Sequence, residues 1–209
     1  HIVMFPNLQS ETVIPLTVDD TEPACDAIPG YLAADAVTIA TRDDSFAWSP
    51  DGRRLAFVAM REGPTADLYL YDTITSSIAR ITQQGAHASR PLWSLDGAFI
   101  LHTALIGANI DTGMHVQGFW QSTVDGSEAS RVHEGEDQLV GWTSGNNFLY
   151  YQVDTLCGKH DVHSVDQSSA EIQVWAGSFD RVAADPVSGA VVVAVWEQTA
   201  ASGHCAGLQ

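Results

Sequence analysis

The stretch FAWSPDGRRLAFVA, residues 46–59, joins a tryptophan, a tight turn and an apolar run, and it decides the fold because it recurs. Three later stretches repeat its pattern: LWSLDGAFILHTA from Leu92, GWTSGNNFLYYQV from Gly141 and a degenerate AADPVSGAVVVAV from Ala183. The anchor residues Trp48, Trp93 and Trp142 are spaced by 45 and then 49 residues, and Ala184 takes the equivalent place in the last copy. A period of about 40–50 residues is typical of chains built from repeated small sheets.

The chemistry of each copy predicts a β-hairpin. Asp51-Gly52 and Asp96-Gly97 favour a tight turn, because glycine tolerates positive φ and aspartate accepts hydrogen bonds from the turn backbone. A run of β-forming apolar residues follows each turn: Leu55–Val58, Phe99–Leu101, Phe148–Tyr151 and Val191–Val195. We expect the tryptophan before each turn to pack between neighbouring sheets.

A second pair of strands follows the hairpin in three of the units. Residues 67–82, 119–133 and 161–175 alternate apolar and polar side chains around a polar turn, which indicates half-buried strands. Each unit is therefore predicted to be a four-stranded antiparallel sheet, and such sheets arranged radially form a β-propeller. The expected fold class is all-β, a propeller of four-stranded antiparallel blades in a partial or composite ring.

The two ends of the chain fall at the same phase of the repeat. The last unit has one hairpin, and the segment 1–17 has the pattern of the missing second one, so the two ends are expected to supply the two halves of a composite blade. The expected division is a half-blade at 1–17, a connector at 18–44, blades at 45–89, 90–138 and 139–180, and a half-blade at 181–209.

Three arrangements of the ring stay open. The chain is a piece of a propeller with about six to eight blades, or it pairs with a second copy so that each completes the other's half-blade, or it closes alone with four blades. The same reasoning therefore includes a homodimer among the expected assemblies.

The units AWSPDGRRLAF and LWSLDGAFILH resemble the TolB-like, WD-repeat-like propeller repeat, in which W-S-P-D-G precedes a basic residue and an L/I-A-F strand. The first unit matches almost completely, whereas the second departs at Leu95 and Ala98, and the third keeps only Trp142 and Gly145. The resemblance covers about residues 45–197. It implies an extracytoplasmic bacterial protein that binds other proteins across the ring face; similar repeats also form the lid domain of prolyl-oligopeptidase-like peptidases. The repeat residues are scaffold in these families, so no functional residue carries over.

Composition narrows the partners. The chain has 26 acidic and 9 basic side chains and a formal net charge of −17, which argues against a nucleic-acid partner, because phosphate backbones are bound by clustered lysine and arginine. The longest apolar run, AVVVAVW at 190–196, is far shorter than the ~18 residues that span a bilayer, so no membrane span is expected. A protein partner is expected.

Motifs for catalysis are missing from the sequence. No G-x-S-x-G elbow is present, since GWTSG at 141–145 places its serine one position late, and the Walker, dinucleotide and calcium-loop patterns are also absent. The segment CGKHDVH, 157–163, has metal-ligand residue types, but His160 and His163 would point to opposite faces of a strand. No catalytic, cofactor-binding or metal-binding residue and no cofactor is therefore predicted.

Three cysteines, Cys25, Cys157 and Cys205, permit at most one internal disulfide. Cys157 and Cys205 occupy equivalent loops of successive units, so a disulfide between them would link neighbouring blades and place the chain outside the reducing cytosol. The unpaired state of all three is the alternative.

Two functional hypotheses follow. The first is a non-catalytic scaffold that binds a protein or small ligand through inter-blade loops, of which the longest are Arg61–Ala66, Gly107–Gly118 and Thr199–Ala206. The second is the regulatory, substrate-gating propeller of a larger enzyme such as a prolyl-oligopeptidase-like serine peptidase. The ligand-binding residues themselves stay unassigned, and an extracytoplasmic location is expected.

Overall fold

The computed structural model describes residues 3–4, 14–15, 46–59, 61–62, 65–83, 87–108, 115–135, 137–154 and 158–195. Within these ranges every regular element is a β-strand except one short 3₁₀ helix, η2 (Ser144–Asn146). The prediction of an all-β fold is confirmed. No helix in the described ranges has the length and apolar character needed to cross a membrane.

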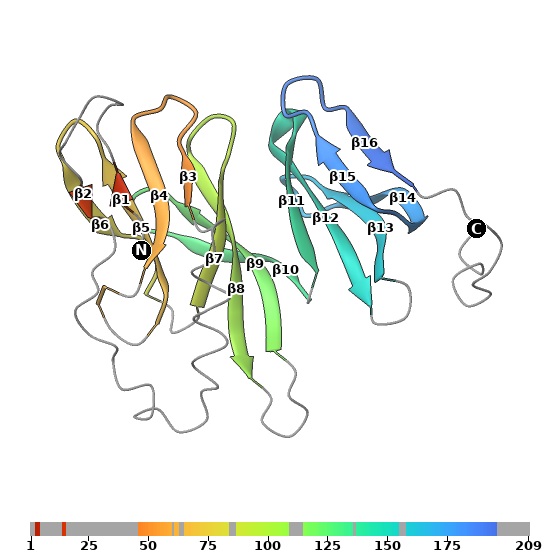
Figure 1. Ribbon diagram of the computed structural model, residues 1–209, viewed down its shortest axis with the longest axis horizontal. Helices are drawn as coiled ribbons and strands as arrows, with labels where there is room; N and C mark the ends of the chain where they lie inside the picture. Colours follow the sequence, from red (N-terminus) through yellow and green to blue (C-terminus); the bar gives the residue numbers. More distant parts are fainter. Residues whose placement is uncertain are drawn as a thin grey trace.

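Three four-stranded antiparallel sheets follow one another along the chain (Figure 1). The first contains β3 (Phe46–Trp48), β4 (Arg54–Ala59), β5 (Asp67–Asp72) and β6 (Ser77–Arg80). The second contains β7 (His87–Trp93), β8 (Phe99–Ala108), β9 (His115–Thr123) and β10 (Ala129–Glu134). The third contains β11 (Gln138–Thr143), β12 (Asn147–Asp154), β13 (Gly158–Val165) and β14 (Glu171–Ser178). In each sheet the strands are hydrogen-bonded in sequence order.

Two further hairpins form two-stranded sheets of their own. One pairs β1 (Val3–Met4) with β2 (Ile14–Pro15), and the other pairs β15 (Arg181–Ala184) with β16 (Val191–Ala194). The connector at 18–44 and residues 196–209 lie outside the described residues. The sharing of one blade by the two ends of the chain stays a prediction.

The first strands of successive sheets contact one another: β3 meets β7, β7 meets β11, and β11 meets β15. The first strand of each sheet is therefore the innermost one, and the sheets lie beside one another as blades (Figure 1). This is the arrangement of a partial β-propeller, as the repeat predicts.

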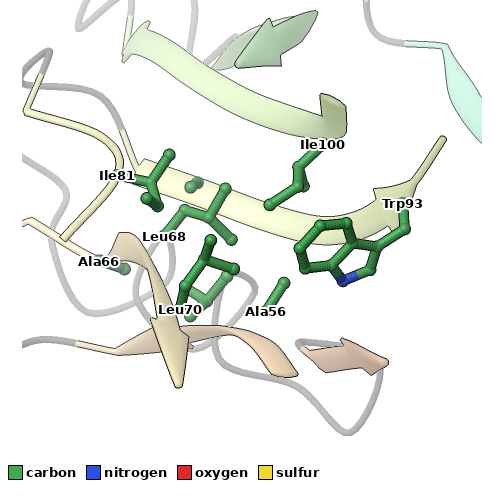
Figure 2. Packing of buried hydrophobic residues seen from close by; sticks show 9 residues of the cluster. Ala56, Ala66, Leu68, Leu70, Ile81, Trp93 and Ile100 are labelled. Atoms are coloured by element: carbon green, nitrogen blue, oxygen red, sulfur yellow. The ribbon is translucent and has the colours of Figure 1, made fainter. Parts of the chain in front are cut away.

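Most of the hydrophobic core lies between neighbouring blades, and one further cluster lies within the first blade, on β4, β5 and β6. One cluster joins Ala56, Leu68 and Ile81 of the first sheet to Trp93 and Ile100 of the second (Figure 2). A second cluster joins the second sheet to the third, and a further cluster joins the third sheet to the β15–β16 hairpin. Burial of these faces is the main force that holds the blades together.

The predicted role of the tryptophans is confirmed for two of the three copies. Trp93 and Trp142 are each only 6% exposed and belong to the inter-blade clusters. Trp48, in contrast, is 46% exposed, so its expected packing between sheets is wrong for the first copy. The tryptophan of the first copy therefore contributes less to the core than those of the two later copies.

The turns follow the predicted chemistry. Gly52 and Gly97 have φ of +69° and +71°, which their lack of a side chain permits. The Asp51 carboxylate accepts hydrogen bonds from the Ser49 hydroxyl and the Arg53 N–H, and these bonds lower the pKa of Asp51. The same pattern recurs at Asp96.

A buried polar network stands at the junction of the first two blades. Asp67 is fully buried, and its carboxylate accepts hydrogen bonds from Arg80 at 2.6 Å, Thr65 at 2.8 Å and Thr82 at 3.0 Å. His87, at the start of β7, accepts a hydrogen bond from the Ala66 N–H at its Nδ1. A buried charge is tolerated when it is paired and fully hydrogen-bonded in this way.

Candidate binding site

A pocket of about 510 Å³ lies against the first strands of four successive units. Its apolar wall comes mainly from β3, β7, β11 and β15 and includes Phe46, Leu92, Leu139, Val140, Phe179 and Val182. Its polar lining consists of Arg90, Tyr151, Lys159 and Arg181. A concavity that combines apolar walls with a few polar groups is typical of ligand sites.

The pocket is at the end of the blades from which the predicted binding loops leave. In an antiparallel sheet the second strand returns to the end where the first strand begins, so β4, β8 and β12 end on the pocket side; their arrowheads all point downward in Figure 1. The loops at Arg61–Ala66 and Gly107–Gly118 start there. Residues 63–64 and 109–114 of these loops, and the whole of Thr199–Ala206, lie outside the described residues.

The described lining of the pocket carries positive charge in a strongly acidic chain. Arg90, Lys159 and Arg181 are three of only nine basic residues in the sequence, and no aspartate or glutamate is among the described residues that line the pocket. The chain as a whole carries a formal charge of −17. This local inversion of charge distinguishes the pocket from the chain's average surface.

Arg90 is held in place by an irregularity in β7. Its φ is +51°, and the pairing of β7 with β8 shifts register between Ser89 and Leu92. The guanidinium donates a 2.6 Å hydrogen bond to Oε1 of Gln138, the first residue of β11. A β-bulge re-aims a side chain in this way, and here it sets Arg90 between two innermost strands.

Lys159 and Arg181 approach the pocket from the third sheet and the last hairpin. Lys159 Nζ donates a hydrogen bond to the Asp180 carbonyl at 3.1 Å and lies 6.0 Å from the centre of the Tyr151 ring. The Arg181 side chain is 85% exposed, and its Nε lies 3.7 Å from an Asp180 carboxylate oxygen. Both cations can therefore turn toward a ligand without leaving a buried partner unpaired.

Tyr151 and Phe179 form the aromatic part of the wall. Their rings meet edge to face with centroids 5.3 Å apart. Burial raises the pKa of Tyr151, although the charge of Arg90 opposes this, so the phenol stays neutral at physiological pH. The wall therefore adds apolar area and a hydroxyl but no negative charge.

The histidine segment has a different geometry from the one expected. Because Asp161 is an extra, bulged residue with φ of +46°, His160 pairs with Gln152 and His163 with Tyr150. Gln152 and Tyr150 are two residues apart on β12, so the two histidines share a face, and the prediction of opposite faces is wrong.

Asp161 contacts the first of these rings, with its Oδ2 3.2 Å from His160 Nδ1. Burial raises its pKa, but the hydrogen bonds from the Gly177 N–H and from His160 outweigh burial and bring the pKa below its usual value. The His163 ring stacks on Tyr150 at 5.1 Å. In the described part of the chain no group of three or more histidine, cysteine or carboxylate side chains is placed to hold a metal ion. Cys157, like Cys25 and Cys205, lies outside the described residues.

Sequence reasoning missed the pocket residues. Two features of the sequence could have identified them. Basic residues are scarce in this chain, and Arg90 and Arg181 occupy similar positions in their repeat units, each shortly before the turn that ends the first strand. The arrangement can bind and orient an anionic ligand. No serine, cysteine or histidine is among the described residues of the lining, so these residues assign it no nucleophile–base pair.

Comparison with known proteins gives similar folds and one close local match. No family model matches the chain. A stretch of 60 residues is 47% identical to the uncharacterized peptidase YuxL of Bacillus subtilis, and it covers 29% of this chain but only 9% of that protein.

Three solved structures match larger parts of the chain. TolB from Acinetobacter baumannii has a TM-score of 0.53 at 19% identity, with 71% of this chain and 36% of that chain covered. The tricorn protease has a TM-score of 0.54 at 12% identity, with coverage of 71% and 20%. A prolyl endopeptidase has a TM-score of 0.53 at 16% identity, with coverage of 74% and 29%.

The chain thus spans well under half the length of each of these proteins, and at these identities the solved structures bear on the fold alone. The repeated hairpins, the four-stranded blades and the similarity to these solved structures all indicate the same fold. The chain has the TolB-like β-propeller fold.

Proposed function

We propose that this chain is a non-catalytic part of a propeller protein and that it binds a protein or small ligand at the pocket formed by its innermost strands. The observation that carries the proposal is the convergence of Arg90, Lys159 and Arg181 on one apolar-walled concavity. The blades fix the backbone positions of these residues, which reduces the ordering required on binding. An extracytoplasmic location is part of the same proposal.

A second candidate is the substrate-gating propeller of a larger peptidase. The 47% identity to part of a B. subtilis protein named as a peptidase favours it, because that local match is much stronger than any of the structural likenesses. In that case the same pocket would contact the peptide on its way to a catalytic domain in the rest of the protein.

Site-specific photo-crosslinking tests the binding role. A photoreactive phenylalanine analogue replaces Phe46, which lines the pocket and is 47% exposed, and the matched control places it at Ile74, a 72% exposed position in the turn between β5 and β6. Irradiation in the source cell is expected to give an adduct at position 46 and not at 74. Equal adducts at both positions, or none at 46, would contradict the proposal.

Intact mass and active-site labelling separate the two candidates. The native gene product is purified and treated with a fluorophosphonate, which labels activated serines. A mass near 22.4 kDa without label supports a separate binding module. A larger, labelled product supports the gating domain of a serine peptidase.

A further inference from the structure

We propose that the ligand of the pocket is a peptide carboxylate next to an apolar side chain, with Arg90, Lys159 and Arg181 supplying the positive charge. This inference rests on the proposed function and names its ligand class. Three cations around one concavity, without a lining carboxylate in the described residues, give a site that prefers a negative group.

The distribution of charge limits the ligand to one or two negative groups. The formal charge of −17 repels extended polyanions, and six of the nine basic residues lie outside the pocket lining. A phosphodiester chain needs many phosphate contacts, which the three cations of the described lining do not supply. A single carboxylate can be neutralised inside the pocket while the rest of its carrier stays uncharged.

Arg90 and Lys159 are anchored at positions suited to a carboxylate. The bond from Arg90 to Gln138 fixes the guanidinium at the junction of β7 and β11, and guanidinium groups form paired hydrogen bonds with carboxylates. Lys159 donates a hydrogen bond to the backbone carbonyl of Asp180, and Arg181 is the residue that follows Asp180 in the chain. Together they bring positive charge from three different blades to one place.

The apolar lining of the pocket favours an apolar side chain next to the ligand's carboxylate. Phe46, Leu139, Phe179 and Val182 supply apolar surface, and Tyr151 supplies a ring. The volume of about 510 Å³ is in the range of sites for small organic ligands, which is roughly 300–1,000 Å³. An apolar residue beside the carboxylate therefore gains burial together with charge pairing.

Fluorescence anisotropy with defined peptides tests this ligand class on the complete chain. The probes are Ala-Ala-Ala-Phe with a free carboxylate, the same peptide as its C-terminal amide, and Ala-Ala-Glu-Phe amide, each labelled at its amino terminus with an uncharged BODIPY dye. The first carries an α-carboxylate, the second carries none, and the third carries a side-chain carboxylate. Binding of the first or third probe at least tenfold tighter than of the second is expected, and the preferred one identifies the source of the carboxylate.

Charge-removing variants locate the binding. Lys159→Gln and Arg181→Gln alter exposed side chains, so they are expected to fold normally and to weaken binding of the acid probe by about tenfold or more each, in line with the strength of hydrogen bonds to charged groups. Arg90→Gln is expected to weaken it at least as much. Arg53→Gln and Arg131→Gln are matched controls, because each removes one positive charge outside the pocket. The Arg53 side chain is 47% exposed and pairs with Asp72, and the Arg131 side chain is 42% exposed and pairs with Glu134.

The outcomes separate this inference from the proposed function. Equal binding of acid and amide, equal effects of the pocket and control variants, or no binding of any probe overturns the carboxylate assignment. If crosslinking at position 46 succeeds despite such a result, the binding role stands with another ligand. If crosslinking fails as well, both proposals fail.

Discussion

The indole Nε1 of Trp93 donates a 3.0 Å hydrogen bond to the backbone carbonyl of Ala47, which joins the second blade to the innermost strand of the first. The guanidinium of Arg54 lies 5.3 Å from the centre of the same ring. Figure 2 shows Trp93 in the cluster that also contains Ala56 and Ile100. The repeated tryptophan is thus both a filler of the inter-blade space and a polar link across it.

Replacing this tryptophan by phenylalanine separates the two roles. Trp93→Phe keeps an aromatic ring but leaves the Ala47 carbonyl without its donor, so we expect a loss of about 1–3 kcal/mol in the free energy of unfolding. Urea denaturation measures it. Trp48→Phe is the control, because its ring is 46% exposed, and it is expected to change stability by less than about 0.5 kcal/mol. A comparable loss in both variants would show that the hydrogen bond is unimportant.

Gly126 is expected to be more sensitive to substitution than Gly52. Both have positive φ, +71° and +69°, so alanine is strained by about 1–2 kcal/mol at either position. A Cβ on Gly126 would also lie 3.0 Å from the Ile81 carbonyl oxygen in the first blade, whereas one on Gly52 meets nothing within 4 Å. Gly126→Ala should therefore lower the denaturation midpoint more than Gly52→Ala, and equal midpoints would contradict the close approach of the two blades at Gly126.

The two carboxylates near Arg80 are expected to contribute very differently. Asp67 is fully buried and 2.6 Å from the guanidinium, whereas Glu62 is 63% exposed and 3.9 Å away. Asp67→Asn leaves a partly buried cation without its closest partner, so a loss of about 3–5 kcal/mol is expected. Glu62→Gln should change the unfolding free energy by less than about 1 kcal/mol. Similar values from urea denaturation of the two variants would contradict the network described above.

His102 is expected to make the protein sensitive to acid. Burial lowers its pKa from 6.5 to about 4, although a hydrogen bond to the Thr103 backbone opposes this, and its Nε2 lies 3.1 Å from the Ser122 hydroxyl. As the pH falls from 6.5 to 4, the unfolded chain takes up a proton that the folded chain does not. The folded state therefore loses about 3 kcal/mol over this interval from this group.

The His102→Leu variant provides the comparison. It is less stable at pH 7, because the Ser122 hydroxyl loses its partner, but its unfolding free energy should fall less steeply between pH 6.5 and 4. Urea denaturation at several pH values measures both slopes. His87, whose pKa burial also lowers while the charge of Asp67 raises it, leaves a residual slope in the variant. Parallel slopes would exclude a role for His102.

The fold was largely predictable because its determinants are local. Asp51-Gly52 and Asp96-Gly97 form turns because of their own side-chain and backbone chemistry. The strands that follow them are recognisable from their own run of β-forming apolar residues. The bulge at Asp161 could not be predicted in the same way, because an inserted residue with positive φ leaves no mark in the alternation of side chains. The exposure of Trp48 depends on what packs beside β3, which its own repeat unit does not encode.

The candidate site was not predictable for a related reason. Arg90, Lys159 and Arg181 are separated by 69 and 22 positions and belong to different units, so only the packing of neighbouring blades brings them together. Sequence reasoning turned to the long loops instead. The end of the sheets from which two of those loops leave is the end at which the pocket lies.

In each blade, every strand is hydrogen-bonded only to the strands next to it in the sequence. This pairing has a consequence for biosynthesis. Each sheet closes only short loops, which keeps the entropic penalty of its formation small. A blade has all its strands as soon as its own stretch has left the ribosome, and the finished face then offers an apolar surface to the next first strand. The chain is therefore suited to folding during translation, one sheet after another from the amino-terminal side.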